Sequence, residues 1–445
     1  MRMLLISLAA ITCLAASHPA AEGRAETEPR EIEPEAGAFT QAADEASERS
    51  PFRSEENLLR KVLHAPSYLL IPFKEPVKRF LIFAERIALV DRVLDVLYFN
   101  DEQTAGWLPN ASFGGKTGFA LGGNVFHHDL FRRGKEVSFS FLGGPETIEV
   151  ELAVLDPAVL ETPFVAQFDF LYQEINDQDV FLSLRDGAFT TGQGVGPDDE
   201  RNYDLDQATG SLDVGYRLTP TWRLGAVFRY AAVRAGGSGD RPAPRELEGM
   251  SDDYIRYVGT EGYIYLDSRN SAFRATRGWV ADLRGGAVGN VRGEDEAGRD
   301  LRFFRYSMEL QRYQQLFAFL RTLVVRALVI RTEPLHRGDG VPFYWQPALD
   351  EDTGLRGYTR GRFRDRGAVL FNLEYRYPVW DTWEGTVFLD EGQVFHQYGD
   401  IRWEAFRWSA GVGAQFSTRS RFLLRTQLAV SDEGVVGLIK LSQAF

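Results

Sequence analysis

The alternation of residue types over residues 107–445 restricts the fold more than any other feature of the sequence. Large apolar side chains recur at every second position, with polar, charged or glycine residues between them. The clearest stretch is 406–416, where one face carries Phe406, Trp408, Ala410, Val412, Ala414 and Phe416. Successive side chains of a strand point to opposite faces of a sheet, so a period of two predicts β-strands with one apolar face.

Two kinds of β-protein show this alternation. A soluble sandwich buries the apolar face in a core, whereas a membrane barrel turns it outward to lipid. Here the apolar face is large and aromatic on nearly every predicted strand, and aromatic residues make up 13% of the chain. Charged residues still make up 25%, because only every second strand residue would face lipid. We therefore expect an all-β fold, an antiparallel transmembrane β-barrel.

Sixteen segments with this pattern predict a barrel of sixteen strands. They are 107–113, 117–128, 135–143, 146–155, 162–174, 205–217, 221–234, 255–267, 277–290, 300–313, 317–332, 367–378, 384–393, 403–415, 421–431 and 435–445. Short connectors such as 218–220 and 378–382 alternate with long ones at 175–204, 235–254 and 333–366. Outer-membrane barrels place short turns in the periplasm and long loops outside, and an even strand number returns both barrel ends to the periplasmic side.

The N-terminal region predicts export. Residues 1–21 have the pattern of a signal peptide, with Arg2 before an apolar stretch at 4–16 and small residues after it. The only cysteine, Cys13, lies inside this segment, so we expect no disulfide and no thiolate metal site in the mature protein. Residues 22–56 contain eleven acidic and four basic residues and few large apolar ones, which predicts a disordered acidic linker over 22–54.

Residues 55–98 predict an amphipathic helical extension. Pro66 ends a first short helix and Pro76 opens a second, which runs to about Tyr98 with apolar residues at helical spacing. Three placements stay open: packing under the barrel or inside it as a plug of the lumen, lying on the inner leaflet, or docking a periplasmic partner. Beyond the signal peptide, no segment has eighteen consecutive apolar residues, which argues against a helical membrane protein.

Composition and motifs exclude several functions. A net charge of −13 argues against nucleic-acid binding, which needs a basic face. The sequence contains neither a Gly-x-Ser-x-Gly elbow nor a His-Glu-x-x-His motif, so we expect no enzyme. We also expect no cofactor and no metal, and we place the pair His127-His128 in a polar turn between the second and third strands.

Three polar elements follow one another near the end of the chain. The long connector 333–366 contains Arg356-Gly357-Tyr358, and the next strand is expected to point Glu374 inward. The strand after that carries Phe388-Leu389-Asp390-Glu391-Gly392, with Phe388 and Asp390 inward. Because a guanidinium can bond carboxylates bidentately, a connector folded into the lumen would let Arg356 pin it to both carboxylates. The alternative is that these are ordinary charges of a pore lining.

The order of these motifs resembles that of the bacterial surface antigen superfamily, which includes the BamA and TamA assembly factors and the transporters of two-partner secretion. Asp267-Ser268-Arg269 and Thr276-Arg277-Gly278-Trp279 also resemble a turn of that family, and Leu355 replaces its usual Val or Ile. The resemblance covers about 107–445. It implies sixteen strands, a lateral seam between the first and last strands, and a sixth loop locked in the lumen by Arg356, Gly357, Tyr358, Glu374, Phe388, Asp390 and Gly392. Members usually carry periplasmic POTRA domains, whereas the segment before Trp107 lacks their strands, so we expect a POTRA-less member.

The C-terminus resembles the assembly signal of outer-membrane barrels, with Gly437, Ile439, Leu441 and Phe445 on one face. The leading hypothesis is therefore an outer-membrane barrel that aids protein insertion or translocation, or perturbs the membrane, through a lateral seam. Its partners would be outer-membrane lipid and unfolded outer-membrane or secreted proteins. The alternatives are a plugged passive channel or structural barrel, and a docking module that binds a periplasmic partner through 55–98.

Overall fold

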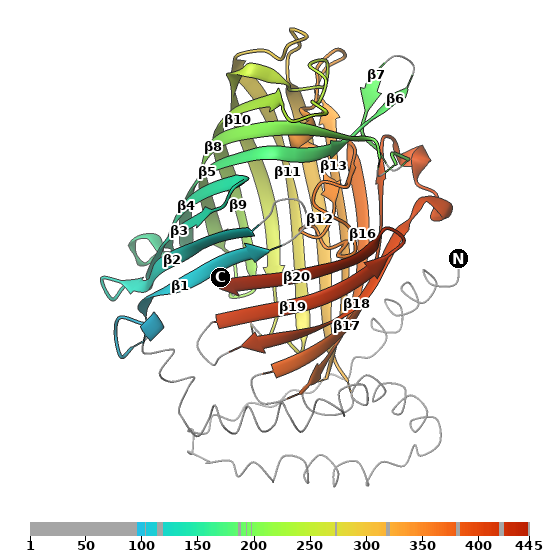
Figure 1. Cartoon of the computed structure of the whole chain (residues 1–445). Coiled ribbons are helices and arrows are strands. Elements are labelled where there is room, and N and C mark those ends of the chain that lie inside the picture. Colours follow the sequence, from blue (N-terminus) through green and yellow to red (C-terminus); the bar gives the residue numbers. More distant parts are fainter. Residues whose placement is uncertain are drawn as a thin grey trace, which may run out of the picture.

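The computed structural model describes residues 96–443, apart from residues 103, 114–118, 186–187, 193, 197, 272–273, 317–320, 380–382 and 418–421. Sixteen antiparallel strands form one closed barrel, which confirms the predicted barrel architecture (Figure 1). The predictions for residues 1–54, and for the extension 55–98 except its last three residues, lie outside the described part. Within the described residues, no helix is long and apolar enough to cross a membrane.

The barrel strands, in chain order, are β1 (Ala105–Phe113), β2 (Phe119–Leu130), β3 (Lys135–Gly143), β4 (Thr147–Asp156), β5 (Phe164–Phe181), β8 (Glu200–Arg217), β9 (Trp222–Gly237), β10 (Ser251–Asp267), β11 (Gly278–Arg292), β12 (Arg302–Gln315), β13 (Thr322–Pro334), β16 (Gly367–Pro378), β17 (Trp383–Phe395), β18 (Arg407–Ser417), β19 (Phe422–Ser431) and β20 (Gly434–Gln443). Two small hairpins lie in loops: β6 (Ser183–Arg185) with β7 (Ala188–Thr190), and β14 (Ala348–Leu349) with β15 (Phe363–Arg364). The short 3-10 helices are η2 (Val159–Glu161), η3 (Phe343–Trp345), η4 (Tyr398–Asp400) and η5 (Trp403–Ala405).

The apolar face of the strands points outward, as the alternation predicted. On β18, the exposed fractions of Trp408 and Val412 are 45% and 49%, whereas those of Ser409 and Gln415 are 0% and 1%. Exposed Phe139, Phe168 and Leu212 continue this outer apolar surface on other strands. A soluble sandwich would show the reverse burial, so the pattern fits a wall that faces lipid outside and a polar lumen inside.

The wall is uneven in height. β5 and β8 have 18 residues each, whereas β1 and β3 have nine and β4, β19 and β20 have ten. A tilted strand of about 9–11 residues just crosses the hydrocarbon core. The strands on both sides of the junction between β1 and β20 are therefore barely long enough to span a bilayer, while the opposite wall extends well beyond it.

The barrel closes weakly at this junction. β1 pairs with β2 along its whole length, and β20 pairs with β19 along its whole length. Among the described residues, β1 and β20 pair with each other only at Phe113 opposite Ile439 (Figure 1). We call this junction the seam.

Two local predictions were wrong. The strand expected from residue 403 begins at Arg407, because η5 precedes it and the rings of Trp403 and Phe406 stack at 5.6 Å. The histidine pair does not lie in a turn, because β2 continues to Leu130 before the chain reverses. His128 is buried there, and its Nδ1 lies 2.9 Å from an Oε2 atom of Glu136.

Candidate functional site: the loop inside the barrel

The connector between β13 and β16, residues 335–366, folds back into the barrel, and we call it loop six. Its apolar residues Leu349, Leu355, Tyr358 and Phe363 are almost fully buried in one cluster with side chains of β13, β16 and β17. Burying an apolar side chain of this size contributes about 1.5–3 kcal/mol. Loop six is thus part of the folded core of the protein.

Local chemistry shapes the central part of loop six, residues 350–362, which we call the lobe. The pairs Ala348–Arg364 and Leu349–Phe363 between β14 and β15 close its base. The Asp350 carboxylate accepts hydrogen bonds from the backbone N–H of Thr353 at 3.0 Å and of Gly361 at 2.8 Å. Gly354 has a φ of 117°, which side-chain-bearing residues rarely adopt. Together these features turn the chain so that Arg356 points at the barrel wall.

Arg356 lies between two carboxylates of the wall. Its Nε and one terminal nitrogen donate to the two oxygens of Asp390 at 2.9 and 2.7 Å, and the other terminal nitrogen donates to Glu374 at 2.7 Å. The guanidinium also lies 3.5 Å from the ring centroid of Phe388. Burial opposes the charged form of Arg356, but hydrogen bonds and charges of Asp390 and Glu374 outweigh it and raise its pKa. Arg356 therefore stays cationic at every relevant pH.

Further side chains hold these carboxylates in place. Asn372 donates to Asp390 at 2.7 Å, and Ser409 donates to it at 3.0 Å. Arg376 donates to the second oxygen of Glu374 at 2.7 Å. Asp390 is 0% exposed, so its charge depends on these donors and on Arg356 for stabilisation.

Gly357 and Tyr358 connect the lobe to the last hairpin, β19–β20. A Cβ atom on Gly357 would lie 2.6 Å from Cβ of Ser409 and 2.8 Å from Cβ of Ser431, so only glycine fits. The Ser431 hydroxyl donates to the Gly357 carbonyl at 2.8 Å, and the Tyr358 hydroxyl donates to the carboxylate of Asp432. Burial and this hydrogen bond raise the pKa of Tyr358, so it remains a neutral donor.

Glycines make room for the aromatic and aliphatic packing. A Cβ on Gly392 would lie 2.8 Å from Leu349 of loop six, and a Cβ on Gly411 would lie 2.4 Å from the ring of Phe388. The two glycines therefore let the strands approach loop six and the Phe388 ring closely. The structure thus brings together all seven residues expected at the loop.

Sequence reasoning missed Arg362. This side chain is 2% exposed, and its Nε donates to Glu433 in the β19–β20 turn at 2.9 and 2.8 Å. A terminal nitrogen donates to the carbonyl of Val195, in the loop between β5 and β8, at 3.0 Å. Its guanidinium also lies 4.6 Å from the ring centroid of Phe181 on β5. No motif signals this role, because the partners lie far away in the sequence on both sides of the seam.

The C-terminal residues lie in the last strand. Gly437 and Ile439 belong to β20, with Ile439 47% exposed on the outer face. Leu441 also lies in β20, opposite Leu424, whereas Phe445 lies outside the described residues. No group of three or more potential metal ligands occurs among the described side chains.

Fold and site together define an integral outer-membrane β-barrel with a loop fixed in its lumen. The sequence matches the family described as "Omp85 superfamily domain" over residues 129–433. This match covers more than half of the chain, which therefore belongs to the Omp85 superfamily and is an outer-membrane protein of a Gram-negative bacterium. The prediction that the chain is not an enzyme agrees with this membership.

Solved structures resemble the same barrel. BamA from Haemophilus ducreyi lacking POTRA domains 1–3 matches with a TM-score of 0.53 and 14% identity, over 76% of this chain and 70% of that one. CdiB from Escherichia coli matches with a TM-score of 0.50 and 10% identity, over 76% of this chain and 62% of that one. At these identities the likeness concerns the fold alone. Comparison with curated proteins gave no match.

Proposed function

We propose that this protein inserts polypeptides into the outer membrane, or translocates them across it, by opening the seam between β1 and β20. The observation that carries the proposal is the single pair of facing residues, Phe113 and Ile439, that closes the barrel among the described residues. Each backbone hydrogen bond adds only about 0.5–1.5 kcal/mol to stability. A junction of this kind therefore opens at far lower cost than any fully paired strand interface of the same barrel.

Open seam strands would offer a template to a client. An unpaired strand edge presents free backbone N–H and C=O groups, to which an extended chain can add as a new strand. β1 has such an edge over most of its length, because among the described residues only Tyr98, opposite Gly106, and Ile439, opposite Phe113, pair with it on that side. The short strands beside the seam also reduce the height of the barrel wall at the place where a client would enter the bilayer.

Loop six would control the seam through the last hairpin. Tyr358 and Arg362 bond to Asp432 and Glu433, so β20 cannot move outward at that end without breaking these contacts or carrying the lobe with it. Arg356 would act as the lock that fixes the lobe to β16 and β17. In this proposal, the lock keeps β20 oriented, and its loss lowers activity although the barrel remains folded.

The experiment follows the folding of a small unfolded barrel client in liposomes that contain the purified protein. Acceleration over empty liposomes, reduced severalfold by Arg356→Met and unchanged by Arg360→Met, would support insertion. Arg360 is the matched control, because it lies in the same lobe but is 38% exposed, with Asp352 3.4 Å away. A rate equal to that of empty liposomes would refute the proposal, and conductance recordings would then test the passive channel.

A further inference from the structure

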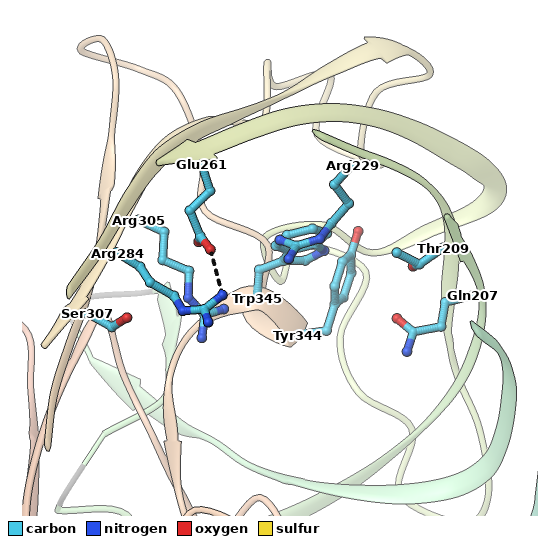
Figure 2. Close-up of a pocket in the computed structure, with 9 residues that line it drawn as sticks. All are labelled: Gln207, Thr209, Arg229, Glu261, Arg284, Arg305, Ser307, Tyr344 and Trp345. Atoms are coloured by element: carbon cyan, nitrogen blue, oxygen red, sulfur yellow. Dashed lines mark hydrogen bonds and ion pairs between the residues drawn. The ribbon is translucent and has the colours of Figure 1, made fainter. Parts of the chain in front are cut away.

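The lumen contains a second polar feature, distant from the Arg356 lock. A cavity of about 400 Å³ lies between the wall formed by β8 to β12 and the 3-10 helix η3 of loop six (Figure 2). We call it the lumen cavity. Three arginines face it: Arg229 of β9, Arg284 of β11 and Arg305 of β12.

The charges of the lumen cavity are not balanced. Arg284 is paired, with Asp282 at 2.9 Å and Glu261 at 3.5 Å. Arg229 and Arg305 form no hydrogen bond or ion pair with any side chain that the structure describes. Glu261 in the lining and Asp282 beside Arg284 offset two of the three guanidinium groups, which leaves an excess of one positive charge. Two guanidinium groups inside a barrel that have no carboxylate partner, here those of Arg229 and Arg305, favour the binding of an anion.

Loop six supplies an aromatic side to the cavity. The guanidinium of Arg229 lies 5.8 Å from the ring centroid of Trp345. Figure 2 shows the two side chains next to each other. Trp345 packs against Phe303 at 5.5 Å, and the hydroxyls of Tyr344 and Tyr257 are hydrogen-bonded at 2.7 Å. These contacts fix both rings, so they offer a rigid apolar surface beside the arginines.

Neutral donors complete the lining. Gln207 and Thr209 of β8 lie on one side of the cavity, and Ser307 of β12 lies on the other. Burial raises the pKa of Tyr344 well above its usual value, so its hydroxyl stays neutral. Cavities of about 300–1,000 Å³ with an apolar side and a few converging polar groups are typical of small-molecule sites.

We propose that the lumen cavity binds a small molecule that carries a phosphate or carboxylate group. Arg229 and Arg305 bind the oxyanion, Arg284 adds a donor that Glu261 holds in position, and Trp345 packs against the remainder of the ligand. Because Trp345 belongs to loop six, a bound anion would also tie η3 more firmly to the wall. This site is independent of the proposed insertion function, since none of its residues contacts the seam or the Arg356 lock.

Calorimetric titration of the detergent-solubilised full chain at low ionic strength tests the site. The probes are inorganic phosphate, pyrophosphate and tricarballylate, with glycerol as the neutral comparison. Replacing one charged donor by Arg229→Gln or Arg305→Gln should weaken oxyanion binding roughly tenfold, and both together about a hundredfold. Arg305→Lys keeps the charge and should retain most of the affinity. Comparing the affinities for phosphate and for tricarballylate shows whether the cavity prefers a phosphate or a carboxylate group.

Arg223→Gln is the matched control. Arg223 lies on the lumen face of the same strand, about 20 Å along it from Arg229, with its guanidinium 5.3 Å from the ring centroid of Tyr263. Its replacement should leave oxyanion affinity unchanged. The proposal is overturned if no oxyanion binds the wild type, if the double variant binds as well as the wild type, or if Arg223→Gln weakens binding as much as the double variant. Unchanged heat-modifiable mobility on gels verifies that each variant barrel is folded.

Discussion

Replacing Arg356 by methionine should release the lobe of loop six while the barrel stays intact. The variant loses three charge-assisted hydrogen bonds and leaves the fully buried Asp390 without a cation. Breaking a buried ion pair costs about 3–5 kcal/mol. Asn372 and Ser409 still donate to Asp390, so we expect the lower end, about 3 kcal/mol, which raises the ratio of open to closed lobe by roughly 100-fold.

Hydrogen–deuterium exchange measures this change directly. The backbone N–H groups of Gly354 and Leu355 donate to the Asp350 carbonyl, so their exchange reports on lobe opening. They should exchange about 100-fold faster in Arg356→Met, while amides of β8 and β9 keep their protection. Arg360→Met should change little, because an exposed ion pair contributes about 0–1 kcal/mol.

A double variant tests the cause of the effect. Asp390→Asn removes the lone buried charge, so Arg356→Met combined with Asp390→Asn should recover part of the lost protection. Wild-type exchange of the lobe in Arg356→Met would refute the reasoning. So would a loss of protection over the whole barrel, because the lobe would then not be a separate opening unit.

Three further predictions concern the contacts of loop six with the last hairpin. Burial opposes ionisation of Asp432, but the Tyr358 hydrogen bond and a nearby arginine lower its pKa. Its contribution to stability is therefore present above about pH 4 and lost as pH falls through the lowered pKa. Tyr358→Phe should remove about 1 kcal/mol of that pH-dependent stability, measured as thermal midpoints from pH 3 to 7. Gly357→Ala should cost about 1–3 kcal/mol in thermal unfolding, because the added methyl group overpacks against both Ser409 and Ser431. Arg362→Gln should lower the free energy of unfolding by about 2 kcal/mol, a value below that of a fully buried ion pair because Glu433 is partly exposed. It should also speed amide exchange in the β5–β8 loop, where Arg362 donates to the Val195 carbonyl, and unchanged exchange there would contradict its bridging position.

The sequence was informative where a local rule applies. A period of two located all sixteen barrel strands, with ends that differ from the observed ones by at most seven residues, because one face of each strand must be apolar when the other lines a polar lumen. The same rule placed Glu374 and Asp390 on the inner face, where both are buried. The start predicted at residue 403 was wrong, because Trp403 lies in η5 and stacks on Phe406 ahead of the strand.

Long-range contacts had no local signal. Arg362 is one of several arginines in loop six, and nothing near it in the chain indicates that it bonds to Glu433 and Val195. The lumen cavity likewise combines Arg229, Arg284 and Arg305 from three strands, and only the register of the barrel brings them together. The roles expected for Arg356 and its partners, and for the helical extension at 55–98, remain predictions that experiments must test.

A reversible crosslink across the seam tests the central proposal most directly. Phe113→Cys with Ile439→Cys, in a Cys13→Ser background, would join the only facing pair of β1 and β20 among the described residues. A matched disulfide at Phe228 and Thr260 would join β9 and β10, which are fully paired already. We predict that oxidation of the seam pair abolishes the acceleration of client folding in liposomes, that reductant restores it, and that the matched disulfide has no effect. Equal acceleration by the oxidised and reduced seam variants would contradict insertion through a lateral opening.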